Sequence, residues 1–172
     1  NVKPEELLDK LYKAYERVWN DTRKALADKI TLSQSDVLTI ASIVDEETNK
    51  NDEKENVASV YLNRIRKGMK LQADPTARFA YGDFSIKRVL NKHIRFDSPW
   101  NTYKVEGIPP GPICTPQPSS IDAVLANKQT EYIFFCAKED FSGYHNFAKN
   151  GTEHEANAKK FRKAMDERGI KR

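Results

Sequence analysis

The chain has 172 residues, 38% of them hydrophobic and 31% charged, which predicts one soluble, globular domain with its own core. No run approaches the roughly 20 apolar residues of a membrane span, and the N-terminus lacks a signal-peptide pattern. The formal net charge is +4, with Lys and Arg spread among nearly as many acids, so we expect no nucleic-acid partner. Because the chain opens at Asn1 without a Met, we interpret it as a fragment of a longer protein.

The two cysteines, Cys114 and Cys136, could pair, but two are too few to define a disulfide framework. Three His and no C-x-x-C motif argue against a structural zinc site. We therefore expect neither a metal nor a cofactor.

The first predicted element is a long amphipathic helix. Pro4 followed by Glu5 and Glu6 suits a helix start, because Pro fits the first turn and acids suit its positive end. Apolar residues then recur at helical spacing from Leu7 to Leu26. This pattern predicts one continuous helix whose apolar stripe lies in the core.

Two further helices are predicted in the first half of the chain. Ser33 with Asp36 three residues later forms a variant of the capping box, which opens a helix running to about Glu47. The next helix covers about residues 52–67, with Gly68 as its C-terminal cap.

The middle of the chain is irregular. Residues 68–84 contain Asp-Pro and Tyr-Gly pairs, which are loop signals. A short helix is predicted from Ser85 to about Asn91. Six prolines in residues 98–120 exclude a regular helix there. We expect an ordered, extended segment, and ordered long loops are often functional.

The C-terminal part combines helix and sheet. A short helix begins near Ser119, and the apolar run at 132–137 predicts a buried strand. Residues 144–148 are its expected hairpin partner. Thr152 and Glu155 form a second capping box that opens a last helix to about residue 168. The predicted fold class is α+β: a mostly helical single domain with a small antiparallel β-sheet and a long ordered Pro-rich segment.

One carboxylate of the helix after Ser33 is out of place. With Ile40 set at 0° and an advance of about 100° per residue, the apolar face is centred slightly past 0°. On this wheel Asp45 falls at about 140°, at the edge of the apolar face, and Glu46 at about 240°, toward solvent. Glu47 falls at about 340°, within the apolar stripe.

A carboxyl group held against apolar side chains loses hydration of its charged form, so its pKa should rise. A raised pKa lets a general acid keep its proton near neutral pH, as in glycoside cleavage. The alternative is that Glu47 ends the helix at the rim of the core and pairs with an Arg or Lys.

The segment ending at Glu47 is also the first of five blocks that resemble one family. It is similar to the A-S-I-V-x-x-E signature of the endolytic murein transglycosylases, the MltG or YceG-like family. The blocks occur in order and span nearly the whole chain. They are Ala41–Glu47, Val57–Arg64, Gly68–Thr76 (G-M-K-L-Q-A-D-P-T), Asn101–Tyr103 with Gly107–Ile113 and Pro116, and His145-x-Phe147 with His154.

This resemblance implies that Glu47 takes the place of the family's catalytic glutamate and that residues 1–172 form a single catalytic domain. It further implies a bacterial enzyme at the periplasmic face of the inner membrane, with a membrane anchor and a small LysM-like domain upstream of this chain. Such enzymes cut nascent peptidoglycan between N-acetylmuramic acid and N-acetylglucosamine without water and leave 1,6-anhydro ends. The implied partners are peptidoglycan glycan strands and peptidoglycan synthases.

A lytic transglycosylase needs one carboxylate, because the C6 hydroxyl of the substrate replaces the second nucleophile of a hydrolase. We assign the acid and base roles to Glu47. The residues expected to bind substrate carry hydroxyl, amide, carboxyl or imidazole groups within the family blocks. They are Gln72, Asp74, Thr76, Asn101, Tyr103 and His145.

Five of these six residues, all except Asn101, also have a structural reading. An Asp-Pro turn could hold residues 72–76 by itself, Tyr103 could pack beneath the Pro-rich segment, and His145 could orient Glu47 or make a structural hydrogen bond. His154 is expected to be structural, and Tyr81 is undecided. Two other functions remain open: a peptidoglycan-binding module without activity, and a hydrolytic muramidase with Asp74 as second carboxylate. A basic nucleic-acid-binding domain is a distant third.

Overall fold

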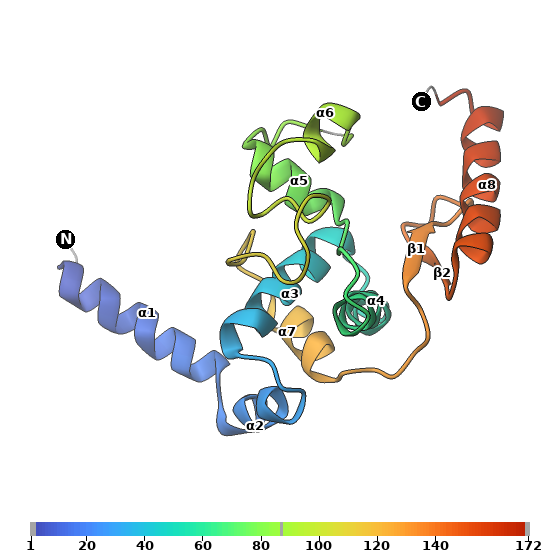
Figure 1. Ribbon diagram of the computed structural model, residues 1–172. Coiled ribbons are helices and arrows are strands. Elements are labelled where there is room, and N and C mark those ends of the chain that lie inside the picture. Colours follow the sequence, from blue (N-terminus) through green and yellow to red (C-terminus); the bar gives the residue numbers. More distant parts are fainter. Residues whose placement is uncertain (1–2, 87, 171–172) are drawn as a thin grey trace.

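The computed structural model describes residues 3–86 and 88–170. It is mostly helical with one two-stranded antiparallel sheet, which confirms the predicted α+β class (Figure 1). The elements in chain order are α1 (Pro4–Val18), α2 (Asp21–Lys29), α3 (Gln34–Glu47), α4 (Lys54–Arg66), α5 (Asp74–Tyr81), α6 (Asn91–Ile94), α7 (Pro118–Leu125), β1 (Phe134–Ala137), β2 (His145–Ala148) and α8 (Gly151–Glu167).

The prediction of one long N-terminal helix is wrong. The helix breaks at Trp19 and Asn20, where the Asn20 side chain accepts a hydrogen bond from the backbone N–H of Arg23 and caps α2. Trp19 is fully buried, while α1 extends away from the body (Figure 1) and contains no buried residue. The apolar stripe of α1, from Leu7 to Tyr15, is therefore exposed rather than part of the core.

The core is built around α3 and α4. The predicted capping box of α3 is confirmed, because Ser33 and Asp36 exchange side chain to backbone hydrogen bonds. Ile40 and Val44 of α3 are fully buried, and α4 and α7 pack against this helix. The third predicted helix is confirmed as α4, and Gly68 follows it with a positive φ of 64°.

The middle of the chain differs from the prediction. Residues 74–81, expected in a loop, form α5, because Asp74 and Pro75 fit the first turn of a helix as well as they fit a turn. The helix predicted from Ser85 to Asn91 is wrong for residues 85, 86 and 88–90, and residue 87 lies outside the described residues. A helical turn, α6, begins at Asn91 instead.

The Pro-rich segment is ordered, as predicted. The indole N–H of Trp100 donates to the carbonyl of Gly111 (3.0 Å), and the backbone N–H of Ile113 donates to the Ser42 hydroxyl (3.0 Å). These bonds hold the segment to itself and to α3. Its Cys114 is a free thiol, as is Cys136.

The predicted hairpin is confirmed by β1 and β2, which pair antiparallel with Phe135 opposite Phe147, and α8 packs against both strands. The cap of α8 differs from the prediction: Asn150, not Thr152, accepts from the N–H of Glu153. Because the asparagine lies two residues earlier, the helix begins at Gly151.

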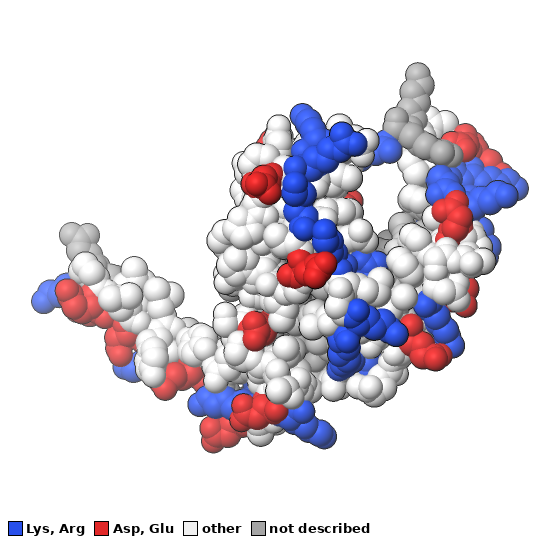
Figure 2. Space-filling model, in the orientation of Figure 1, with Lys and Arg blue, Asp and Glu red and all other residues white. Residues whose placement is uncertain are grey.

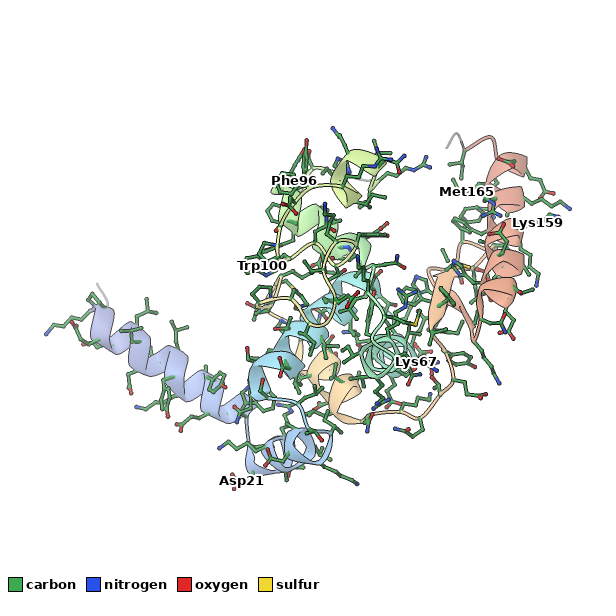
Figure 3. All side chains as sticks on the ribbon, in the orientation of Figure 1. Asp21, Lys67, Phe96, Trp100, Lys159 and Met165 are labelled. Atoms are coloured by element: carbon green, nitrogen blue, oxygen red, sulfur yellow. The ribbon has the colours of Figure 1, made fainter. Side chains whose placement is uncertain are left out.

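In Figure 1, α5 and α6 lie on one side of the C-terminal end of α3, and the hairpin with α8 lies on the other. Figure 3 places Phe96 and Trp100 with the first group and Met165 and Lys159 on α8. No helix among residues 3–86 and 88–170 has the length and apolar character needed to cross a membrane. Within the same residues, no three His, Cys, Asp or Glu side chains cluster in a way that could hold a metal ion.

Candidate active site

A cavity of about 210 Å³ opens at the C-terminal end of α3. Five parts of the chain contribute to it: α3, α4, the loop into α5, the Pro-rich segment and β1. Polar side chains from the first four surround it, and two apolar side chains complete the wall. The lining residues are Glu47, Tyr61, Arg64, Leu71, Gln72, Asp74, Tyr103 and Phe135.

The three consecutive acids of α3 have different environments. Asp45 accepts hydrogen bonds from buried Lys54 (2.9 Å) and from Ser120, which outweigh its burial and keep its pKa low. Glu46 pairs with Arg78 at the surface. Glu47 alone faces the cavity. The helical wheel separated these residues correctly, because an advance of 100° per residue sends neighbours to different sides.

The pKa of Glu47 is raised from its usual range to about 7. Burial is the main cause, since it removes water from the carboxylate, and the negative charges of Asp74 and Glu46 add to it. A hydrogen bond from Tyr61 and the charge of Arg64 act in the opposite direction. The predicted rise is thus confirmed. Glu47 is the last residue of α3, as the alternative expected, but within the described chain it forms no ion pair, so the pairing with Arg or Lys is wrong.

Two side chains of α4 support Glu47. Tyr61 is only 2% exposed, and its hydroxyl donates a hydrogen bond to Oε1 of Glu47 over 2.6 Å. Arg64, one turn later, is 7% exposed, and its guanidinium donates to the carbonyls of Ile133 (2.7 Å) and Leu71 (2.6 Å). Arg64 thereby ties β1 and the loop before α5 to α4 and places a positive charge beside the cavity.

The opposite wall brings together three of the predicted substrate-binding residues. Gln72 has a positive φ of 51°, and its backbone N–H donates to the carbonyl of Thr102 (3.1 Å). Its side chain is exposed, as is that of Asp74. The Tyr103 hydroxyl donates to Oδ1 of Asp74 over 2.5 Å, and burial together with this carboxylate raises the pKa of Tyr103.

Two other predicted residues do not line the cavity. Thr76 and Asn101 are fully buried. The Thr76 hydroxyl bonds the Ala73 carbonyl (2.7 Å) and the Thr102 hydroxyl (2.7 Å). The Asn101 amide donates to three carbonyls, those of His93 (3.1 Å), Ile94 and Phe96. Both side chains shape the loops that carry Asp74 and Tyr103.

The histidines and Tyr81 also lie outside the cavity wall. His145 interacts through Nδ1 with buried Glu53 (2.8 Å), so it orients that residue rather than Glu47. His154 stacks on Phe134, with ring centroids 5.0 Å apart, in the structural position expected of it. The Tyr81 ring packs edge-on against the ring of His93, with ring centroids 4.8 Å apart, and so joins α5 to α6.

Sequence reasoning missed Tyr61, Arg64, Leu71 and Phe135. The sequence held a usable signal for Tyr61 and Arg64 as site residues. They are three residues apart, so they lie on the same side of a helix, and both fall within one family block. Leu71 and Phe135 carried none, since apolar residues in a loop or strand are ordinarily packing residues.

Known proteins resemble this chain in sequence and in fold. The YceG-like family profile matches residues 1–160. The endolytic murein transglycosylase of Bacillus subtilis (strain 168) is 36% identical over 168 residues, covering 96% of this chain and 46% of the relative. The protein of the same name from Streptococcus pneumoniae (strain D39) is 27% identical over 157 residues, covering 89% of this chain and 28% of the relative.

A crystal structure of a YceG-like protein from Listeria monocytogenes superposes with a TM-score of 0.80 at 34% identity. It is matched over 90% of this chain and 50% of that protein. The chain thus spans about half, or less, of the length of the relatives it matches.

Proposed function

The chain belongs to the YceG-like family, and we propose that it carries the catalytic site of an endolytic murein transglycosylase, with Glu47 as acid and then base. The substrate is the β-1,4 bond between N-acetylmuramic acid and N-acetylglucosamine in nascent glycan strands. The observation that carries this proposal is a carboxyl with a pKa of about 7 in a cavity lined by polar side chains. The names of the relatives support it independently.

The reaction needs no water. Protonated Glu47 donates its proton to the glycosidic oxygen, and the bond from that oxygen to C1 of the muramic residue breaks. The C6 hydroxyl of the same residue attacks C1 and forms the 1,6-anhydro ring. The Glu47 carboxylate removes the proton of that hydroxyl and is ready for another cycle. A pKa near the working pH suits a group that must give and take a proton in turn.

The remaining lining residues have distinct tasks in this mechanism. Tyr61 and Arg64 stabilise the carboxylate form of Glu47 between its two proton transfers. The negative charge of Asp74 keeps Glu47 protonated before the reaction and stabilises positive character at C1 during it. Gln72 and Tyr103 offer amide and hydroxyl groups to sugar hydroxyls and N-acetyl groups. Thr76, Asn101 and His145 act indirectly, by positioning these elements.

The cellular setting is part of the same proposal. We place residues 1–172 as one catalytic domain of a longer protein held at the periplasmic face of the inner membrane, with peptidoglycan synthases as partners. The resemblance of the sequence blocks to the family supports this placement.

Hydrolysis is the second candidate, because Asp74 lines the same cavity as Glu47 and could serve as a second carboxylate. In that reaction an activated water would replace the C6 hydroxyl. The products would carry a free reducing muramic acid end and one added water.

The test is digestion of purified, uncrosslinked glycan strands, with the products weighed by mass spectrometry. The wild-type chain, Glu47→Gln and Glu55→Gln are compared; Glu55 is an exposed glutamate of α4 outside the cavity. We expect fragments lighter by one water than hydrolysis products from the wild type and Glu55→Gln, and none from Glu47→Gln. Products with the added water would support hydrolysis. No cleavage by the folded wild-type chain would contradict the proposal and favour a glycan-binding module.

A further inference from the structure

Basic charge is concentrated in one segment beside the proposed active site. Residues 64–96 hold nine of the chain's 29 Lys and Arg but only two of its 25 Asp and Glu. The rest of the chain therefore has more acidic than basic residues. The even spread of charge expected from the whole sequence is wrong for this segment, which runs from the end of α4 through α5 to α6.

Much of this charge is not paired with a carboxylate. Five basic side chains are partly or well exposed and form no ion pair within residues 3–86 and 88–170; we call them the basic band: Lys67, Lys70, Arg88, Lys92 and Arg95. The others that the structure describes are engaged: Arg64 is buried, Arg66 bonds the Asn63 side chain, and Arg78 pairs with Glu46.

The basic band lies along one side of the molecule. Figure 2 shows Lys and Arg side chains running from α6 over α5 toward the end of α4. Figure 3 places Lys67 beside α4 on the side that faces the hairpin. Because one protein face collects these like charges, their potentials add and attract anions more strongly than isolated surface lysines do.

The basic band is joined to the catalytic cavity by the chain itself. Lys70 directly precedes Leu71 and Gln72, which line the cavity, and Arg64 holds the Lys70 carbonyl (3.3 Å). At the other end, α5 begins at the cavity residue Asp74, is eight residues long and packs against α6. That length corresponds to about 12 Å, so the cations around α6 lie beyond the cavity. A polymer that crosses Glu47 in the direction of α5 would pass along them.

The chemistry of the basic band identifies which part of such a polymer it contacts. Because each muramic lactyl carboxyl is joined to its peptide stem by an amide bond, the sugar backbone of peptidoglycan is neutral and needs hydroxyl and amide partners, not cations. The peptide stems on the muramic residues carry carboxylates, which pair with Lys and Arg. Building on the function proposed above, we propose that the basic band binds the stem carboxylates of muramic residues flanking the cleaved bond, so that the site selects strands that still carry their peptides.

The experiment measures binding without cleavage. Glu47→Gln chains are titrated with soluble glycan strands that carry peptide stems and with stripped strands. In the stripped strands an amidase has removed the stems, and the lactyl carboxylates freed by that cleavage have been converted to methylamides, so that the strands are neutral. The test variant adds Arg88→Gln, Lys92→Gln and Arg95→Gln. The control instead adds Lys159→Gln, Lys160→Gln and Lys163→Gln on α8, which removes the same charge from another element.

We expect the test variant to bind stem-bearing strands about tenfold more weakly at low salt. Its affinity for stripped strands and the affinity of the control for both ligands should not change. Added salt should weaken the binding of stem-bearing strands most, since exposed charge pairs are screened.

Equal affinity of the Glu47→Gln chain for stem-bearing and stripped strands would overturn the inference, as would an equal loss in the control. Binding of single-stranded DNA as tight as that of stem-bearing strands would overturn it too, because the basic band would then be a general polyanion site. The proposed cleavage reaction is scored separately, by anhydro ends released by the wild-type chain from stripped strands. Either idea can therefore fail while the other stands.

Discussion

The Tyr61 hydroxyl lies 2.6 Å from Oε1 of Glu47 and donates a hydrogen bond to it from inside the core. This bond favours the carboxylate form of Glu47, whereas burial favours the carboxylic acid. Burial is the larger effect, and the resulting pKa of about 7 balances the two forms near neutral pH. Removing either influence should move that balance in a known direction.

Tyr61→Phe removes the hydrogen bond and leaves the ring. The pKa of Glu47 should then rise above about 7, so activity at alkaline pH should persist to a pH higher by about one unit. We also expect kcat to fall, because the carboxylate formed by the first proton transfer loses a partner. The measurement is a pH profile of anhydro-end release, with Tyr12→Phe on exposed α1 as the matched control. A lower kcat with no displacement of the profile would assign Tyr61 a structural role only.

Asp74→Asn should shift the same profile the other way. The negative charge of Asp74 raises the pKa of Glu47, so its removal should lower that pKa. Glu47 must be protonated to act as the acid, and activity should therefore decline at a lower pH than in the wild type. The same kinetic assay measures the shift. A shift toward higher pH would contradict the electrostatic account, and loss of a water-adding activity would instead identify Asp74 as a hydrolytic carboxylate.

Glu47→Gln should stabilise the fold at alkaline pH. The folded-state pKa of Glu47, about 7, exceeds the usual value of 4.5, so the native state holds the extra proton between these pH values. Stability consequently falls as pH rises through this window, by at most about 3 kcal/mol for a fully expressed shift. Gln carries no such charge. The measurement is denaturant unfolding at pH 4 and pH 8. The free energy of unfolding of the variant should increase relative to that of the wild type only at pH 8. A pH-independent difference would disprove the assigned pKa.

Asn101→Ala should lower stability rather than substrate affinity. The Asn101 amide is fully buried and donates to three carbonyls, which the alanine would leave without that donor. We expect a loss of about 2 kcal/mol or more in the free energy of unfolding. Folded enzyme should keep its KM for glycan strands. The exposed Asn49→Ala serves as control. A raised KM with unchanged stability would restore Asn101 as a direct substrate contact.

The parts of the fold that were predicted correctly depend on interactions within a few residues. The Ser33–Asp36 cap and the orientation of Glu47 both follow from helical spacing, which operates over one or two turns. The errors occurred where two local readings were equally consistent with the sequence. Asp74-Pro75 suits a turn or a helix start, and Trp19 fits a helical stripe as well as a buried anchor between two helices.

The sequence by itself determined that Glu47 faces the apolar side of α3, because that orientation is a property of the helix alone. Its resemblance to the family also singled out Gln72, Asp74 and Tyr103, which do meet at the cavity. Only the tertiary structure decided which groups act on Glu47. The Tyr61 hydrogen bond, the Arg64 charge and the Phe135 wall come from elements 14 to 88 residues further along the chain. Their influence depends on distance and burial in space, and these arise when α4 and the hairpin pack against the end of α3.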